Sequence, residues 1–78
     1  MMEQELKYKT SDLYLSAFLK LKSFKMDVEK NKTRVVFVFD KTDELMLNVN
    51  NYLNESASCD PLLYTNSIKN LKNLLYNL

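Results

Sequence analysis

The feature that most constrains this fold is an uninterrupted apolar run, Val35–Phe39, bounded by Arg34 and Asp40. Its β-branched and aromatic residues favour a strand, and the lack of alternation indicates that both faces of that strand are at least partly shielded from water. A chain of 78 residues has little material to cover two faces of a sheet, because a domain of this size buries only about 60% of the surface of its unfolded chain. The run therefore predicts either a covering element from within the chain or an association surface.

A second strand is predicted directly before this run. Over Phe24–Glu29 apolar residues alternate with charged ones, which is the period of a half-buried strand. The polar segment 30–33 is the turn of an antiparallel hairpin, and a two-residue loop at Asn31 and Lys32 places Val28 opposite Val35. A longer loop that shifts the pairing by an even number of residues leaves the same side chains on each face of the hairpin. One face then collects six apolar side chains: Phe24, Met26, Val28, Val35, Phe37 and Phe39.

Three helices are predicted around the hairpin. The first, over 12–22, follows an N-cap signal that ends in Asp12. Thr42 caps the second helix, whose first turn is acidic, and Asp60 with Pro61 starts the third, since proline suits the first helical position. We therefore predict an α+β fold in the order helix, antiparallel β-hairpin, helix, helix.

This fold is expected to form one domain over residues 8–78, preceded by a flexible segment, 1–7. The first helix is apolar around about two-thirds of its circumference, so we expect it at the centre of the core, with Ser16 and Lys20 on its wet side. The side chains predicted to form the core are Leu13, Tyr14, Ala17, Phe18, Leu21, Phe24, Met26, Val28, Val35, Phe37, Phe39, Leu45, Val49, Leu53, Ile68, Leu71 and Leu75.

The residue types that are missing restrict the chemistry. The chain has no glycine and no histidine, and Cys59 is its only cysteine. Phosphate-binding glycine loops and the usual zinc, haem and iron–sulfur sites are therefore not expected. We interpret Cys59 as a half-buried loop thiol, and the carboxylates Asp40, Asp43 and Glu44 as residues of a helix start. No catalytic residue, cofactor or metal is predicted, so the chain does not look like an enzyme.

The net charge of +1 gives no general attraction to nucleic acid or to anionic lipid. No apolar run approaches the roughly 20 residues of a membrane span, and a single cysteine fits a reducing compartment. We expect a cytoplasmic protein that does not bind membranes.

A candidate protein interface follows from the apolar side chains that the predicted faces leave over. Val36 and Val38 fall on the polar face of the hairpin, beside the edge of a strand that begins after Arg34. Two explanations stay open: the third helix covers this side of the sheet, or the surface associates with a second copy or another protein. The candidate interface comprises Arg34, Val36, Val38, Leu15, Leu19 and Leu47.

A candidate nucleic-acid contact lies on the third helix. Thr65, Lys69, Lys72 and Tyr76 form a stripe, called here the lysine stripe, on the side opposite the predicted core face. Lysines with an aromatic side chain can bind phosphate and stack on a base. An ordinary solvated face explains the same pattern, because two lysines provide only weak attraction.

Several blocks of the chain resemble a family of small bacterial and phage proteins that is classified only as a domain of unknown function. The blocks are Tyr8–Leu19, Val36–Phe39, Asp60–Leu62 and Ile68–Lys72. Relatives carry a glycine before the hairpin, where this chain has Ser23. The family has no assigned activity, so the resemblance implies no catalytic residue. It implies a prophage or mobile-element context, with an accessory role in replication or in conflict with the host.

We therefore expect a non-catalytic protein-interaction module, acting as a homodimer or as an antagonist of a host defence complex. The alternative is a nucleic-acid-binding accessory protein of replication or regulation. DNA binding that weakens with added salt would favour the nucleic-acid-binding protein over the protein-interaction module.

Overall fold

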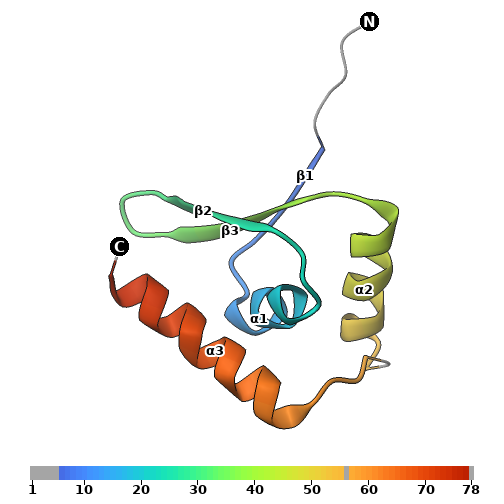
Figure 1. Cartoon of the computed structure of the whole chain (residues 1–78). Coiled ribbons are helices and arrows are strands. Elements are labelled where there is room, and N and C mark those ends of the chain that lie inside the picture. The colour runs from blue at the N-terminus through green and yellow to red at the C-terminus, as the bar shows by residue number, and fades with distance from the viewer. Residues whose placement is uncertain (1–5, 56, 78) are drawn as a thin grey trace, which may run out of the picture.

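The computed structural model describes residues 6–55 and 57–77. The three helices lie on one side of a three-stranded antiparallel sheet (Figure 1), which confirms the α+β class. The predicted order of helix, hairpin, helix and helix is also confirmed, with one further strand in front. The elements are β1 (Lys7–Thr10), α1 (Leu13–Leu21), β2 (Met26–Lys30), β3 (Val35–Asp40), α2 (Asp43–Leu53) and α3 (Pro61–Tyr76).

Strand β1 was not predicted, and it changes the position of the apolar run in the sheet. It pairs with β3 in the strand order β1-β3-β2, so β3 is the central strand and not an edge. Lys7, which we had assigned to the flexible segment, is its first residue and pairs with Asp40. Tyr8 lies opposite Phe39 and is half-buried. Four residues with alternating lysines have little strand preference of their own, so β1 depends on its pairing with β3.

The hairpin has the predicted faces but not the predicted register. The Asn31 amide donates to the Arg34 carbonyl over 2.8 Å, so the tip of the turn lies one residue later than expected. Val28 therefore pairs with Phe37 and not with Val35. Because the shift keeps the parity, the same side chains still point toward the helices.

The helix starts agree with the sequence. Asp12 caps α1 by accepting hydrogen bonds from the amides of the second and third helical residues, at 2.9 and 3.1 Å. Thr42 Oγ1 accepts from the Leu45 amide at 3.0 Å, and Asp60 caps α3 with Pro61 in its first turn. Ser23, just before the hairpin, has a left-handed φ of 75°, a conformation that glycine adopts without steric cost.

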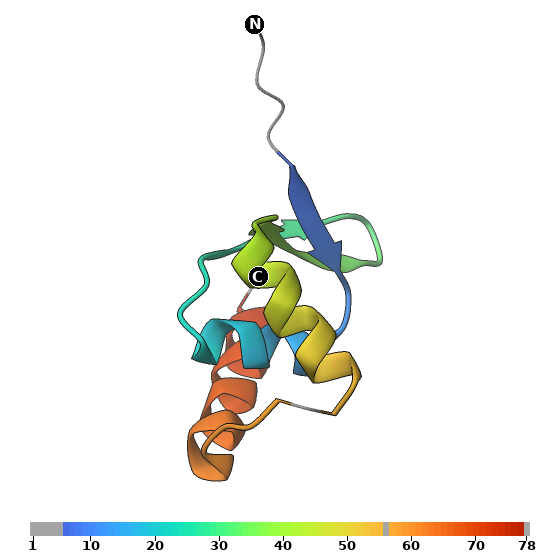
Figure 2. The same ribbon diagram turned by 90° about the vertical axis from the view of Figure 1, so that its right-hand side faces the viewer.

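The core joins α1, α2 and the central strand. Helix α1 contacts α2 and α3, and its buried side chains meet those of the sheet, so almost its whole circumference is enclosed (Figure 2). Ser16 is consequently fully buried and not on a wet side, whereas Tyr14 and Leu53, both predicted core residues, are exposed. The central cluster comprises Leu15, Phe18, Leu19, Phe37, Phe39, Leu45 and Val49.

Candidate functional site

The outer face of the sheet, on the side away from the helices, explains why the apolar run is tolerated. Val38 lies between Lys9 of β1 and Asp27 of β2. The Lys9 Nζ lies 3.5 Å from Glu29 Oε1, which belongs to the strand on the far side of β3. The Lys9 side chain must therefore cross the central strand, and its aliphatic stem covers apolar surface on the way. Val38 is only 6% exposed.

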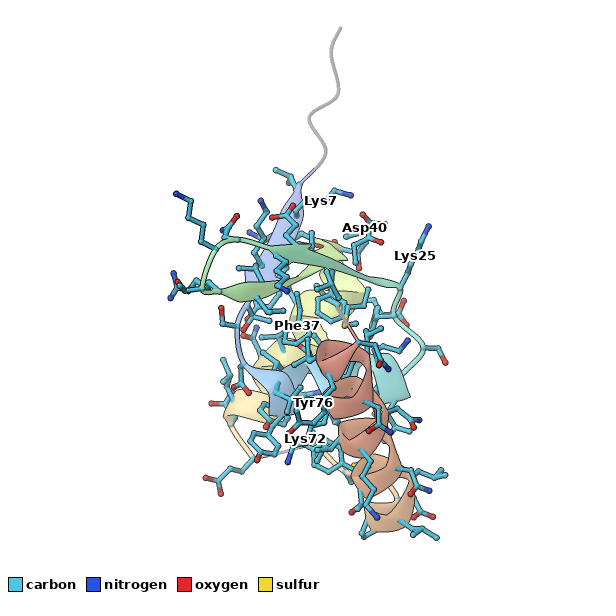
Figure 3. All side chains as sticks on the ribbon, turned by 90° about the vertical axis from the view of Figure 1, so that its left-hand side faces the viewer. Lys7, Lys25, Phe37, Asp40, Lys72 and Tyr76 are labelled. Carbon is cyan, nitrogen blue, oxygen red and sulfur yellow. The ribbon has the colours of Figure 1, made fainter. Side chains whose placement is uncertain are left out.

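A second ion pair flanks these valines. Lys7 Nζ donates to Asp40 Oδ1 over 2.6 Å (Figure 3). This hydrogen bond, followed by the positive charge of Lys7, lowers the pKa of the Asp40 carboxyl below its usual range. On the outer face, paired charges therefore lie over Val36 and Val38. The side chains that cover these valines belong to the same chain.

This arrangement corrects the candidate interface. Leu15 and Leu19 are core residues, and Val38 is buried, so none of them is available to a partner. Val36 is half-buried, while Arg34 and Leu47 are exposed on different elements. Because β3 is paired on both sides, the strand edge that we expected two copies to share does not exist. The expectation that the third helix covers this side of the sheet was wrong, because all three helices lie on the other side (Figure 1).

The lysine stripe is exposed as predicted. Lys72 and Tyr76 extend from α3 close to one another (Figure 3), and Tyr76 is 88% exposed. Lys72, Leu75 and Tyr76 line a shallow hollow of about 370 Å³. At the helical repeat, the stripe lies beside the core-facing residues of α3 and not opposite them.

No further lysine extends the stripe within the described part of α1 or β1. Lys20 belongs to the other side of α3, where it faces Leu63 and Leu74 across a groove. Lys22 Nζ donates to the Ser58 carbonyl over 3.1 Å and lies 5.4 Å from the centre of the Phe18 ring. Lys7 and Lys9 are paired with carboxylates on the sheet. The basic surface of α3 therefore consists of Lys69 and Lys72.

The other side of α3 carries a feature that the sequence analysis missed. A groove of about 500 Å³ separates it from the end of α1, and we call it the α3 groove. Leu63 and Leu74 stand at its ends, 53% and 41% exposed. Positions 63, 67, 70 and 74 share one helix face, but the polar residues between the leucines hide the apolar pattern. The groove is lined by Lys20, Leu21, Leu63, Asn66, Ser67, Asn70, Leu71 and Leu74.

Two hydrogen bonds and one buried leucine fix α3 against α1. Ser67 Oγ donates to the Ala17 carbonyl over 2.9 Å, and Tyr64 Oη donates to the Tyr14 carbonyl over 3.0 Å. Leu71 is the buried residue at the contact. The small side chains of Ala17 and Ser67 let the two helices approach closely at the floor of the groove.

A second hollow lies beside the connection between α2 and α3. It has a volume of about 500 Å³, and its lining includes Tyr52, Cys59 and Tyr64. The phenol oxygens of Tyr52 and Tyr64 lie 3.5 Å apart, and Tyr64 Oη also donates to the Tyr14 carbonyl. Burial, and then the hydrogen bond between Tyr64 and Tyr52, raise the pKa of Tyr64. Cys59 is half-buried, as we interpreted it.

The described residues contain neither a cluster of metal-ligating side chains nor a membrane-spanning helix. Within 6–55 and 57–77, no group of three or more histidine, cysteine, aspartate or glutamate side chains is placed to hold a metal ion. Over the same residues, every helix is too short or too polar to cross a membrane.

Comparison with known proteins identifies a matching family. Residues 5–77 fit the sequence model of a family described as a domain of unknown function, DUF5659. No curated protein and no solved structure matches the chain.

Proposed function

We propose that this chain, which belongs to the DUF5659 family of domains of unknown function, is a non-catalytic module that binds another protein through the α3 groove. The observation that carries the proposal is the pair of half-exposed leucines, Leu63 and Leu74, at the two ends of the groove. Exposed apolar surface of this kind is a common mark of a protein-binding site.

The contents of the groove also favour binding over catalysis. Its lining holds one charged side chain, Lys20, together with leucines and the amides of Asn66 and Asn70. None of these is a general acid, a general base or an activated nucleophile at neutral pH. Apolar contacts with a few amide hydrogen bonds are typical of the centre of an interface.

The lysine stripe supports the alternative proposal, a nucleic-acid-binding accessory role. The exposed ring of Tyr76 stands beside Lys72, so one base and one phosphate would find partners there. Two lysines release few counterions, however, and give weak binding at physiological salt. The protein-binding proposal therefore ranks first.

A pull-down from lysate tests the first proposal. The wild-type chain should recover a specific protein, and the double variant Leu63→Lys, Leu74→Lys should lose it. The matched control is Leu47→Lys, Leu53→Lys, which adds the same charges to exposed leucines of α2 and should keep the capture. Equal recovery by both double variants would show that the groove is not the binding surface.

Titration with single- and double-stranded DNA at two salt concentrations tests the alternative. Binding that salt weakens and that Lys69→Glu reduces would favour the nucleic-acid role, and the absence of binding at low salt would remove it. A mobile-element origin and antagonism of a host defence complex rest on the family context alone. They predict that the captured protein belongs to such a complex.

A further inference from the structure

We infer that the hollow beside the connection between α2 and α3 binds an organic cation that ends in a trimethylammonium group. This hollow shares no lining residue with the α3 groove, so such binding would be a function additional to protein binding at the groove. Three properties of the hollow support it: the aromatic walls, the charge and the size.

Aromatic rings from three helices meet at this hollow. Its lining includes Phe18 of α1, Tyr52 of α2 and Tyr64 of α3. The ring centroids of Phe18 and Tyr52 lie 5.3 Å apart, with the rings tilted by 40°. The phenol oxygens of Tyr52 and Tyr64 lie 3.5 Å apart. The rings therefore form adjoining walls and not a single stack, and the negative faces of such rings attract a cation.

The packing of the core holds these walls in place without a ligand. Phe18 is buried and supports the ring of Tyr52 from behind, whereas Tyr52 and Tyr64 are half-buried and still reach the hollow. Tyr64 Oη donates to the Tyr14 carbonyl over 3.0 Å, which fixes the third wall against α1. Walls that are already ordered lose little conformational entropy when a ligand binds.

The charge of the hollow selects a cation over an anion. Among the described residues of its lining, Glu55 is the one with a charged side chain. Its amide donates to the Tyr52 carbonyl over 3.1 Å, and its φ of 59° is left-handed, so Glu55 is tied to the end of α2. A carboxylate beside aromatic rings attracts a cation and repels an anion.

An ammonium group of the same chain already contacts these rings. Lys22 Nζ lies 5.4 Å from the centre of the Phe18 ring, within the range of a cation–π contact. It also donates to the Ser58 carbonyl over 3.1 Å, and Lys22 is not part of the lining. The hollow itself is therefore open to a second cation, and Glu55 offsets the repulsion from Lys22.

The size and the apolar lining favour a methylated ammonium group. The volume of about 500 Å³ lies in the range of small-molecule sites and exceeds what a compact ammonium needs. Leu53 and Ala57 add apolar surface to the aromatic walls. A primary ammonium is strongly hydrated and stays in water, whereas a trimethylammonium group presents its methyl groups to such a surface.

Titration of the ¹⁵N-labelled full chain with choline, followed by amide chemical shifts, tests the inference. We expect a dissociation constant on the order of 1 mM, with shifts centred on Ala57, Cys59 and Tyr64. The neutral isostere 3,3-dimethyl-1-butanol and the primary amine ethanolamine should each bind about tenfold more weakly or less. Equal binding of either compound, or shifts centred on the exposed ring of Tyr76, would overturn the inference.

Substitutions in the hollow separate its rings from its charge. Tyr52→Leu should weaken choline binding by about tenfold, whereas Tyr52→Phe keeps the ring and should bind like the wild type. Glu55→Gln should weaken it by about threefold, because a nearby charge is lost. The matched control is Glu44→Gln, which removes the same charge from the first turn of α2. Glu55 is exposed, so its variant tests the site even where Tyr52→Leu does not fold. Unchanged affinity in Glu55→Gln would overturn the inference.

A parallel titration identifies the source of the cation. The N-acetyl amide of Nε-trimethyl-lysine carries the same group on the stem of a protein side chain. Tighter binding of this compound than of choline would assign the hollow to a methylated lysine, and tighter binding of choline would assign it to a free small cation. The failure of both to bind at about ten times the expected dissociation constant would overturn the inference and leave the α3 groove proposal unaffected.

Discussion

At the scale of single residues, two serines on facing helices have opposite roles. Ser16 is fully buried in α1, and its Oγ has no hydrogen-bond partner among the described residues. Ser67 on α3 donates from its Oγ to the Ala17 carbonyl. A buried hydroxyl without a partner costs stability, whereas a partnered one contributes to it.

Replacing each serine by alanine should therefore change the free energy of unfolding in opposite directions. Ser16→Ala should raise it by about 1 kcal/mol, because it removes the unpaired hydroxyl at almost constant volume. Ser67→Ala should lower it by about 1 kcal/mol through the lost hydrogen bond. Urea denaturation of both variants measures the two changes, and a loss of stability in Ser16→Ala would show that its hydroxyl is satisfied.

At the scale of elements, β1 does for the outer face of the sheet what a second layer of helices does in larger proteins. Its lysines extend over the central strand and end at carboxylates of β2 and β3. Exposed ion pairs contribute little by themselves. The aliphatic stem of Lys9 over Val38 is the larger effect, since it keeps an apolar side chain from water.

Two substitutions at Lys9 separate the stem from the charge. Lys9→Ala removes both and should lower the free energy of unfolding by about 1 kcal/mol, because Val38 becomes exposed. Lys9→Met keeps most of the stem and should cost less than about 0.5 kcal/mol. Thermal unfolding of the two variants gives the comparison, and equal losses would indicate that the ion pair with Glu29 matters more than the stem.

At the scale of the whole molecule, α3 is attached through α1 rather than through the sheet. Tyr64 is one of its fixed points, because its hydroxyl donates to the Tyr14 carbonyl. Folding raises the pKa of this phenol, so the folded chain favours the neutral form. That contribution is present below the ordinary tyrosine pKa of about 10 and is lost as the pH rises above it.

Tyr64→Phe should therefore lower the stability at pH 7 by about 1 kcal/mol and reduce the further loss between about pH 10 and 12. Tyr76→Phe is the control, because its exposed hydroxyl has no such bond among the described residues. Denaturant midpoints of wild type and both variants, measured across this range, test the claim. An identical alkaline slope for Tyr64→Phe and wild type would contradict it.

Local signals in the sequence were sufficient for the helices and the hairpin. Asp12, Thr42 and Asp60 cap their helices through hydrogen bonds to the next few amides, so no distant residue decides where these helices begin. The alternation around Val28 fixed the faces of the hairpin, although the turn moved by one residue. A change of register that keeps the parity leaves each side chain on its face.

The positions of the candidate sites depend more on tertiary packing than the helices and the hairpin do, so they were harder to predict from sequence. The lysine stripe was found because it belongs to one helix. Leu15 and Leu19 were misassigned because α1 is apolar on most sides, and its periodicity does not say how many neighbours will enclose it. The α3 groove combines residues of α1 and α3 that are about 40 positions or more apart, so no pattern within one segment could reveal it.

By itself, the sequence determined the helix caps and the two faces of the hairpin, because each is settled by interactions over a few residues. Only the tertiary structure decided that Lys7–Thr10 forms a strand, that β3 lies at the centre of the sheet, and that Leu63 and Leu74 border a groove. These features come from contacts between distant segments, whose free energy outweighs weak local preferences.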